Sequence, residues 1–480
     1  MKNSPRSRWL WMAALFAGMA LRAFLVFAVS PGTGDGPMYK ELAQNWRDHG
    51  IYGLDLGGKI TPVDIRMPGY PAFLAAASII FGRGDRPPML AQAVVDIVTC
   101  LLTAALAALL VPPESKKKVA LAALWLSALC PFIASYASAP LTEVLATFWT
   151  VVALVAFAAA CSGRETFEFR VGNRTFRINP WLAGGLAVGV GTLLRPETPL
   201  LLISLAILLI WRWRRFADWD RLVRVGALTA LGLALPLIPW ALRNAVTLHE
   251  FQPLAPRYAI LPGEFATKGF ESWTNTWLVR FRDVELTSWK LGEDPLSISE
   301  VPDSAFDSAD ERARVQSLYD QYNQNSSNMT PEWDAQFAEL ARERTARHPL
   351  RTYLTVPAKR SFTLWLTPRI ELLPYSGEIW PVWQSFLDDH TDFSVTVVLG
   401  LMGIVYVVLA AAGAARIFIR RLLPPPQLWA AALLVTFCLV RTAFFTHVET
   451  PEPRYVLECF PALFALAAML WLHARRNSGP

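Results

Sequence analysis

The feature that most constrains the fold is a series of apolar stretches, each long enough to cross a bilayer, which takes roughly 20 residues per helix. Hydrophobic residues make up 53% of the 480 residues, and 19 of the residues are Trp, which is more than a soluble domain of this size carries. We therefore predict an all-α polytopic membrane protein with about ten transmembrane helices. The expected spans lie near 9–29, 88–110, 119–137, 141–161, 181–195, 197–213, 223–241, 393–411, 427–446 and 456–474.

Basic residues set the expected orientation, because short loops rich in Lys and Arg stay in the cytoplasm. Such clusters occur before the first span, near 116–118, 164–177, 212–224 and 416–421, and after the last span. Both termini are therefore expected in the cytoplasm, and the alternation favours two crossings within 181–213. The sequence pI of about 9.1 is explained by topology, so no nucleic-acid partner is predicted. The first apolar run is interpreted as a retained anchor in the plasma (inner) membrane and not as a signal peptide.

Two segments on the opposite side of the membrane are too long to be simple turns. These are 30–87 and 242–392. We accordingly divide the chain into a transmembrane module over 1–241, with its first outer loop at 30–87, an outer segment with interfacial helices over 242–392, and C-terminal helices over 393–480. Function is expected in the outer segments.

Short helices are predicted within both outer segments. In "GPMYKELAQNWRDHG" the apolar residues Met38, Leu42 and Trp46 recur every four residues, which indicates an amphipathic interfacial helix. Asp35 precedes it, and one interpretation is that this acid only favours the helix N-terminus. A short apolar helix is predicted after 68–71, and a helix starting at Thr330 with the stripe Trp333, Phe337 and Leu340. A helix over 349–367 is expected at the outer interface, although a tilted span stays open.

Ionisable residues inside spans are costly, so their depths are informative. Arg22 and Asp96 lie equally far below the outer ends of their spans, which predicts an ion pair that locks two helices. Glu143 opens a later span and Arg195 lies between two spans. We predict a ring of charges at the outer surface: Asp35, Arg66, Glu143, Arg195, Arg243, Arg441, Glu449, Glu452 and Arg454.

Carboxylates and arginines at a membrane surface suit transfer of a sugar from a lipid phosphate to a hydroxyl group. A carboxylate can orient or deprotonate the acceptor, and cations can stabilise the departing phosphate. The lipid tail of the donor would stay in the bilayer while its head group reaches the site. This arrangement would explain an acid at the membrane edge.

Several motifs, in their order and on their side of the membrane, resemble the GT-C superfamily of polytopic glycosyltransferases. They are "GDGPMYKELAQNW", "RMPGYPAFLA", "LTEVLATF", "AGGLAVGVGTLLRPE", "PWALRNAV" and "EPRYVLECFPALFALAA". Within it, the chain resembles the bacterial branch related to protein O-mannosyltransferases, the lipid A aminoarabinose transferase and the lipopolysaccharide core transferases. The resemblance covers nearly the whole chain except roughly 255–330.

The resemblance implies an inverting transfer from a polyprenyl-phosphate-linked sugar on the periplasmic side. Asp35 matches the first-loop acid of the family, a catalytic base or acceptor-orienting carboxylate, and Glu143 matches the second acid. Arg66 falls near a basic residue that contacts donor phosphate, but here Met67 and Pro68 follow, where the relative has two prolines. The candidate substrate- and phosphate-binding residues are Arg66, Arg195, Arg243, Arg454 and Tyr39.

Other readings stay open from the sequence. Some relatives hold a divalent metal, but His49, His249 and His447 lack ligand spacing, so no metal ligand is assigned. A polysaccharide ligase or polymerase would depend on arginines of the long loop, and a lipid-linked sugar flippase would depend on Arg22 and Asp96. The sugar, the polyprenol, the oligomeric state and the acceptor, whether glycan, lipid or protein, are not indicated.

Overall fold

The computed structural model describes residues 5–29, 34–215, 218–258, 260–261 and 264–472, and the chain divides into two compact units. The first unit comprises Met1–Ala259, Ile370–Val440 and Leu457–Pro480. The second comprises Ile260–Arg369 and Arg441–Val456. The second unit therefore takes up most of the long outer segment that the sequence indicated.

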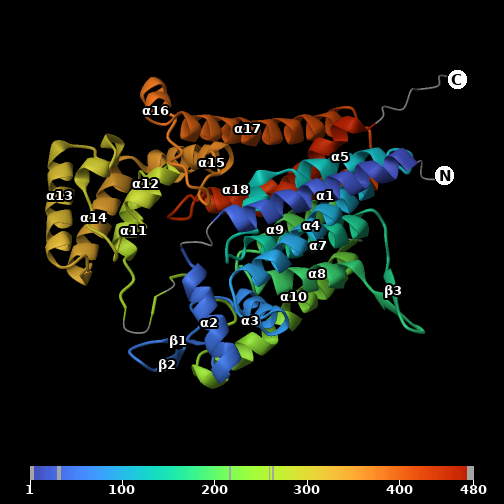
Figure 1. Ribbon diagram of the computed structural model, residues 1–480, viewed down its shortest axis with the longest axis horizontal. Helices are drawn as coiled ribbons and strands as arrows, with labels where there is room; N and C mark the ends of the chain where they lie inside the picture. Colours follow the sequence, from blue (N-terminus) through green and yellow to red (C-terminus); the bar gives the residue numbers. More distant parts are fainter. Residues whose placement is uncertain (1–4, 30–33, 216–217, 259, 262–263, 473–480) are drawn as a thin grey trace. The chain divides into compact units, whose positions relative to one another are not determined.

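The first unit is helical, as predicted. Its elements are α1 (Pro5–Ala28), α2 (Gly36–His49), β1 (Gly53–Asp55), β2 (Ile60–Pro62), α3 (Gly69–Phe81), α4 (Arg86–Leu109), α5 (Lys116–Ala128), α6 (Pro131–Tyr136), α7 (Glu143–Cys161), β3 (Phe167–Val171), β4 (Arg174–Ile178), α8 (Pro180–Thr192), α9 (Leu200–Arg212), α10 (Trp219–Thr247), α16 (Val382–Asp388), α17 (His390–Ile419), most of α18 (Pro425–Phe445), α19 (Phe460–Ala467) and η6 (Ala468–Trp471). Figure 1 shows α1, α4, α7, α8 and α10, each packed against the next.

Seven helical segments in the described residues are long and apolar enough to cross a membrane. They are Ser7–Ala28, Arg86–Leu109, Glu143–Cys161, Trp219–Thr247, His390–Ile419, Pro425–Phe445 and Pro453–Trp471. The remaining expected spans form shorter helices. The chain breaks between α5 and α6 at Pro131, and the segment between α8 and α9 contains Pro196 and Pro199. A proline disfavours helical backbone in the residue before it, so continuous helices end there.

The predicted lock between two spans is confirmed. Arg22 on α1 places its Nε 2.7 Å from Oδ2 of Asp96 on α4, and the two side chains are 0% and 1% exposed. Arg22 also donates to the carbonyl oxygens of Gly18 and Ala128, at 2.9 and 2.7 Å. Its hydrogen-bonding capacity is thus used to join α1, α4 and the end of α5.

The helices predicted in the first outer loop are also confirmed, with one shift of the buried face. α2 buries Tyr39, Leu42 and Ala43, whereas Trp46 is 37% exposed. Leu42 was expected on the buried face of α2. This face includes Tyr39 in place of Trp46, because the Tyr39 ring packs edge-on against Tyr70 of α3, with 5.2 Å between centroids. Between the two helices, β1 and β2 form a short hairpin that the sequence pattern did not predict.

The second unit contains helices around an aromatic core. Its elements are α11 (Lys268–Thr274), α12 (Phe281–Leu286), η2 (Ile298–Glu300), η3 (Asp303–Ala305), α13 (Ala309–Gln324), α14 (Pro331–Arg347), the π-helical turn η4 (Arg351–Thr355) and α15 (Val356–Leu366), and η5 (Pro453–Cys459) begins in it. Thr330 caps α14 by accepting from the Trp333 backbone N–H, as predicted, and Phe337 and Leu340 are fully buried. The helix expected over 349–367 corresponds to η4 and α15.

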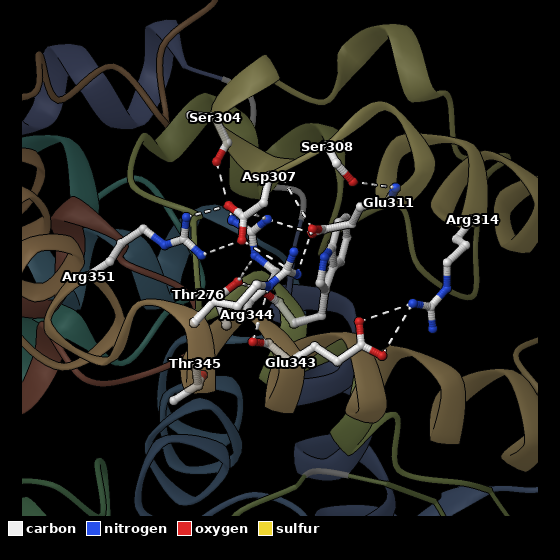
Figure 2. Close-up of polar contacts among 12 residues, drawn as sticks. Thr276, Ser304, Asp307, Ser308, Glu311, Arg314, Glu343, Arg344, Thr345 and Arg351 are labelled. Atoms are coloured by element: carbon white, nitrogen blue, oxygen red, sulfur yellow. Dashed lines mark hydrogen bonds and ion pairs between the residues drawn. The ribbon is translucent and has the colours of Figure 1, made fainter.

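Charged residues form a network of ion pairs in the second unit. Arg344, which is 0% exposed, lies 2.5 Å from Glu311, and Arg351 lies 2.5 Å from Asp307. Figure 2 shows these side chains converging from α13, α14 and the segments beside them. The network ties α13 to α14 over the aromatic core.

Candidate functional site

Asp35 lies where the first span has ended and α2 begins. It occupies the N-cap position of α2, yet its side chain makes no capping hydrogen bond. Instead, its Oδ1 lies 2.7 Å from Nη2 of Arg66, and the two side chains are 31% and 21% exposed. A helix-start role would direct the carboxylate to the N–H groups of the first turn. The carboxylate is thus directed to an arginine and is accessible from outside.

Arg66 is held in place through its own backbone. The Tyr52 hydroxyl donates to the Arg66 carbonyl oxygen at 2.9 Å, which attaches the residue to the β1–β2 hairpin. Three residues later, the Gly69 N–H donates to the Leu193 carbonyl oxygen at 2.7 Å. A Cβ atom at Gly69 would lie 2.6 Å from that oxygen, so only glycine allows this approach. The start of α3 is therefore fixed against the end of α8.

The second ion pair begins at the first residue of α7. Glu143 Oε1 lies 2.9 Å from Nη1 of Arg195, which follows α8. Arg195 Nε is 2.5 Å from Glu197 and 3.5 Å from Glu458, so three carboxylates surround one guanidinium. Glu143 is 4% and Glu458 3% exposed. This pair is more deeply buried than the pair of Asp35 and Arg66.

Glu197 and Glu458 were missed by sequence reasoning. A sequence signal could have identified both acids. Each follows an arginine of a candidate motif within four residues, in "LLRPE" and "EPRYVLE". Glu458 is also held by Thr150 of α7, whose hydroxyl donates to it at 3.0 Å. The cluster thus joins α7, the α8–α9 connection and the last span.

Tyr39 experiences the charges of both ion pairs. Its pKa is raised, first by burial and then by the negative charge of Asp35; Glu143 raises it further, while Arg66 and Arg195 lower it. All four charged side chains of the two ion pairs therefore act on the phenol of Tyr39. Five of the seven predicted site residues, Tyr39 and the four charged residues that act on it, therefore belong to one region of the first unit.

Packing explains why α2 reaches this position. The first residue of α2 is Gly36, where a Cβ atom would lie 2.7 Å from Cγ of Pro140, just before α7. Behind Tyr39, the Tyr70 hydroxyl donates to Gln92, and Gln92 donates to the carbonyl oxygens of Tyr136 and Ala139. The start of α2 is therefore packed against the segment that leads to Glu143.

The Arg243 side chain contacts backbone carbonyl groups and aromatic rings, and these contacts differ from those expected of a phosphate-binding residue. Its guanidinium donates to the carbonyl oxygens of Tyr52 and Val63, at 2.6 and 2.9 Å, and lies over the rings of Tyr52 and Trp240. It therefore attaches the β1–β2 hairpin to α10. It also lines an apolar groove of about 450 Å³, whose other walls include Pro68, Leu193 and Trp240.

Arg454 belongs to the second unit. Its Nε lies 2.5 Å from Oε2 of Glu452, and the Tyr455 hydroxyl donates to the same carboxylate at 2.9 Å. Arg441 donates to the Tyr455 carbonyl oxygen at 2.6 Å. Four members of the predicted ring of charges, Arg441, Glu449, Glu452 and Arg454, thus lie within this unit.

Among the residues that the structure describes, no group of three or more His, Cys, Asp or Glu side chains is arranged to hold a metal ion. His447 instead uses Nδ1 for the Ala443 carbonyl oxygen, at 2.8 Å.

No protein-family model and no curated protein matches this sequence. The structure is similar to that of the archaeal oligosaccharyltransferase AglB from Archaeoglobus fulgidus, in complex with an inhibitory peptide and a dolichol-phosphate, with 13% identity and a TM-score of 0.47 over 97% of this chain and 50% of AglB. It is also similar to apo ArnT from Cupriavidus metallidurans, with 14% identity and a TM-score of 0.42 over 93% of this chain and 78% of ArnT. The chain spans about half the length of AglB.

Proposed function

We propose that this chain is an inverting GT-C glycosyltransferase that moves a sugar from a polyprenyl-phosphate-linked donor to a hydroxyl group of a glycan, lipid or protein acceptor. The observation that carries the proposal is the pair formed by Asp35 and Arg66, a partly exposed carboxylate and guanidinium 2.7 Å apart. One side chain can take up a proton and the other can bind a phosphate. The chemistry needs both beside one sugar, with the carboxylate on the acceptor side of the anomeric carbon and the guanidinium on the phosphate side.

In the proposed reaction, the acceptor hydroxyl oxygen attacks the anomeric carbon from the side opposite the lipid phosphate. The bond from that carbon to the phosphate oxygen breaks, and the electron pair leaves with the phosphate. Asp35 orients the hydroxyl and takes its proton, while Arg66 binds the phosphate as its charge increases. In the resting protein the two side chains neutralise each other, so a bound phosphate at Arg66 would free the carboxylate.

The buried pair of Glu143 and Arg195 is proposed to set the electrostatic potential around Tyr39 and Asp35. Both charges act on the Tyr39 phenol, as do Asp35 and Arg66. A polarised phenol beside the reacting groups can donate a hydrogen bond to a substrate oxygen. We assign Tyr39 to substrate binding for this reason.

The apolar groove is proposed to hold the first isoprene units of the donor. It is lined by Pro68 and Gly69, which follow Arg66 in the chain, and by the aromatic side chains of Trp46, Tyr52 and Trp240. A lipid chain in this groove would bring its phosphate to Arg66. Arg243 supports this wall and is assigned a positioning role.

The site is proposed to face the periplasm, with both termini in the cytoplasm. Asp35 follows the end of α1, and Glu143 begins α7, so both acids lie at one end of the first unit. The basic loops 116–118 and 164–177 lie on the other side of the spans, as the positive-inside tendency predicts for cytoplasmic loops. In this orientation the bilayer surrounds the spans and holds the lipid tail of the donor.

The test is sugar transfer in proteoliposomes with a panel of radiolabelled polyprenyl-phosphate sugars. We expect one donor to be consumed, and we expect Asp35→Asn to lower turnover at least about 100-fold, because a general base contributes roughly that much or more. Asp55→Asn is the matched control, since Asp55 is exposed in the same loop and its side chain accepts a turn hydrogen bond from the Gly58 N–H. Full turnover by Asp35→Asn would refute the assignment.

The same assay separates the alternatives. A polysaccharide ligase or polymerase would tolerate Asp35→Asn and lose activity on substitution of arginines of the second unit. A flippase would move labelled lipid without consuming it and would depend on Arg22 and Asp96. The full burial of that pair, and its bonds to carbonyl oxygens, support a role in holding the helices together.

A further inference from the structure

The hairpin formed by β3 and β4 has an apolar face that is exposed. The register pairs Phe169 with Phe176 and Phe167 with Ile178, so these four side chains lie on one face. The rings of Phe169 and Phe176 stack with 5.5 Å between centroids, and they are 50% and 44% exposed. Two strands alone are marginally stable in water. An exposed aromatic face on such a hairpin indicates a surface that takes up a partner.

The charges of the hairpin have one predominant sign. Residues 164–177 contain four arginines, at 164, 170, 174 and 177, against two glutamates, at 165 and 168. Arg177 pairs with Glu168 across the strands at 2.8 Å, and Arg164 lies over the Phe167 ring. An anionic partner is therefore favoured.

The position of the hairpin identifies that partner. It connects α7, which is long and apolar enough to cross a membrane, with α8, since α7 ends at Cys161 and α8 begins at Pro180. It lies at the end of the first unit opposite Glu143, and in Figure 1 it extends sideways past the helix ends. A hairpin attached in this way stays beside the bilayer.

Aromatic residues mark the membrane surface at the same end. Trp211 near the end of α9 and Trp219 at the start of α10 are 61% and 54% exposed, and Trp181 lies in the first turn of α8. Trp is enriched where helices leave the hydrocarbon region. The apolar face of the hairpin is continuous in sequence with this belt, because Ile178 precedes Trp181 by three residues.

We propose that the β3–β4 hairpin binds the anionic phospholipid surface of the leaflet opposite the carboxylate site, with Phe169 and Phe176 inserted among the head groups and Arg174, on the same face of the hairpin, contacting lipid phosphates. Interfacial aromatics and basic residues together bind anionic membranes. The inference concerns the anchoring of the protein and does not depend on the transfer reaction.

The experiment uses the full chain in proteoliposomes of phosphatidylethanolamine with tritiated phosphatidylglycerol. Phe169 or Phe176 is replaced by the photocrosslinker p-benzoylphenylalanine, and Thr175, on the opposite face of the hairpin, is the matched control position. After illumination, we expect at least about fivefold more lipid label at positions 169 and 176 than at position 175. Equal labelling on the two faces, or crosslinks to protein in place of lipid, would overturn the proposal.

A second arm tests the charges. In the Phe176 photocrosslinker protein, Arg174→Gln, on the same face as Phe176, should lower the phosphatidylglycerol label about fivefold, because a basic side chain near an anionic surface strengthens binding. Added salt should lower the label of the parent protein in the same way. If the label is insensitive to both changes, the anionic surface is not the partner. A folded, monodisperse variant in gel filtration is required for the comparison.

Discussion

At the scale of single residues, Arg66 is the cation whose removal should act on the donor. We expect Arg66→Ala to raise the KM for the lipid-linked sugar at least about tenfold, because the phosphate loses a charge-assisted hydrogen bond worth about 1.5–3 kcal/mol. Arg66→Lys should recover part of the affinity, since it keeps the charge and loses the fork geometry. Transfer kinetics at saturating acceptor would measure both.

The control for Arg66 comes from the same outer loop. Arg83 is 77% exposed and pairs loosely with Asp48 at 3.3 Å, so Arg83→Ala should leave the KM unchanged. An equal change in both variants would show that the loop binds donor through general positive charge. An unchanged KM in Arg66→Ala would remove Arg66 from the site.

Arg195 tests the buried cluster. Arg195→Met should lower the stability of the first unit by about 3–5 kcal/mol, because it leaves the buried carboxylates of Glu143 and Glu458 without the guanidinium. Thermal unfolding followed by tryptophan fluorescence would show a lower midpoint. Glu143→Gln should unfold near the wild-type temperature, because the amide oxygen still accepts from Arg195. A stable Arg195→Met protein would contradict this account.

At the scale of elements, the sequence predicted those features that depend on local periodicity or on the depth of a charge. Leu42 on α2, the cap at Thr330 and the pair of Arg22 and Asp96 are of this kind. The helices near Pro131 and Pro199 are shorter than the predicted spans, because hydrophobicity alone does not mark where a continuous helix ends. Glu197 lies two residues from Arg195 in the sequence, but the approach of Glu458 to Arg195 depends on a contact between distant segments, which no local pattern contains.

The close contact of α8 with α10 allows a prediction at this scale. A Cβ atom at Gly185 would lie 2.3 Å from the Thr229 carbonyl oxygen, and one at Gly232 would lie 2.6 Å from that of Leu182. Small residues let two membrane helices approach in this way. We expect Gly185→Ala to destabilise the first unit by about 1–3 kcal/mol through overpacking, measured as a lower unfolding temperature in detergent.

The matched control lies on α10 itself. A Cβ atom at Gly226 would meet no atom within 4 Å, so Gly226→Ala should be neutral or slightly stabilising. If both alanine variants unfold at the wild-type temperature, the two helices can separate without cost and the contact is not tight. Opposite signs for the two variants would confirm the packing.

At the scale of the whole molecule, the two compact units have separate cores. The second unit has its own cluster of buried aromatic residues, including Phe270, Trp273, Tyr319 and Phe337. Its charge network adds Arg344, which donates to Thr276 and Glu311 at 2.8 and 2.5 Å (Figure 2). Independent cores imply that a defect in one unit can unfold it while the other keeps its structure.

This independence can be tested at Arg344. Arg344→Met should destabilise the second unit by about 3–5 kcal/mol, because Glu311, itself 3% exposed, loses its closest cation. Limited proteolysis should then cut within 260–369 while the transmembrane helices of the first unit stay protected. The control is Arg314→Met, because Arg314 and Glu343 form a pair with 48% and 39% exposed side chains, worth about 1 kcal/mol or less. Simultaneous loss of protection in both units of the Arg344→Met protein would show that the two cores unfold as one.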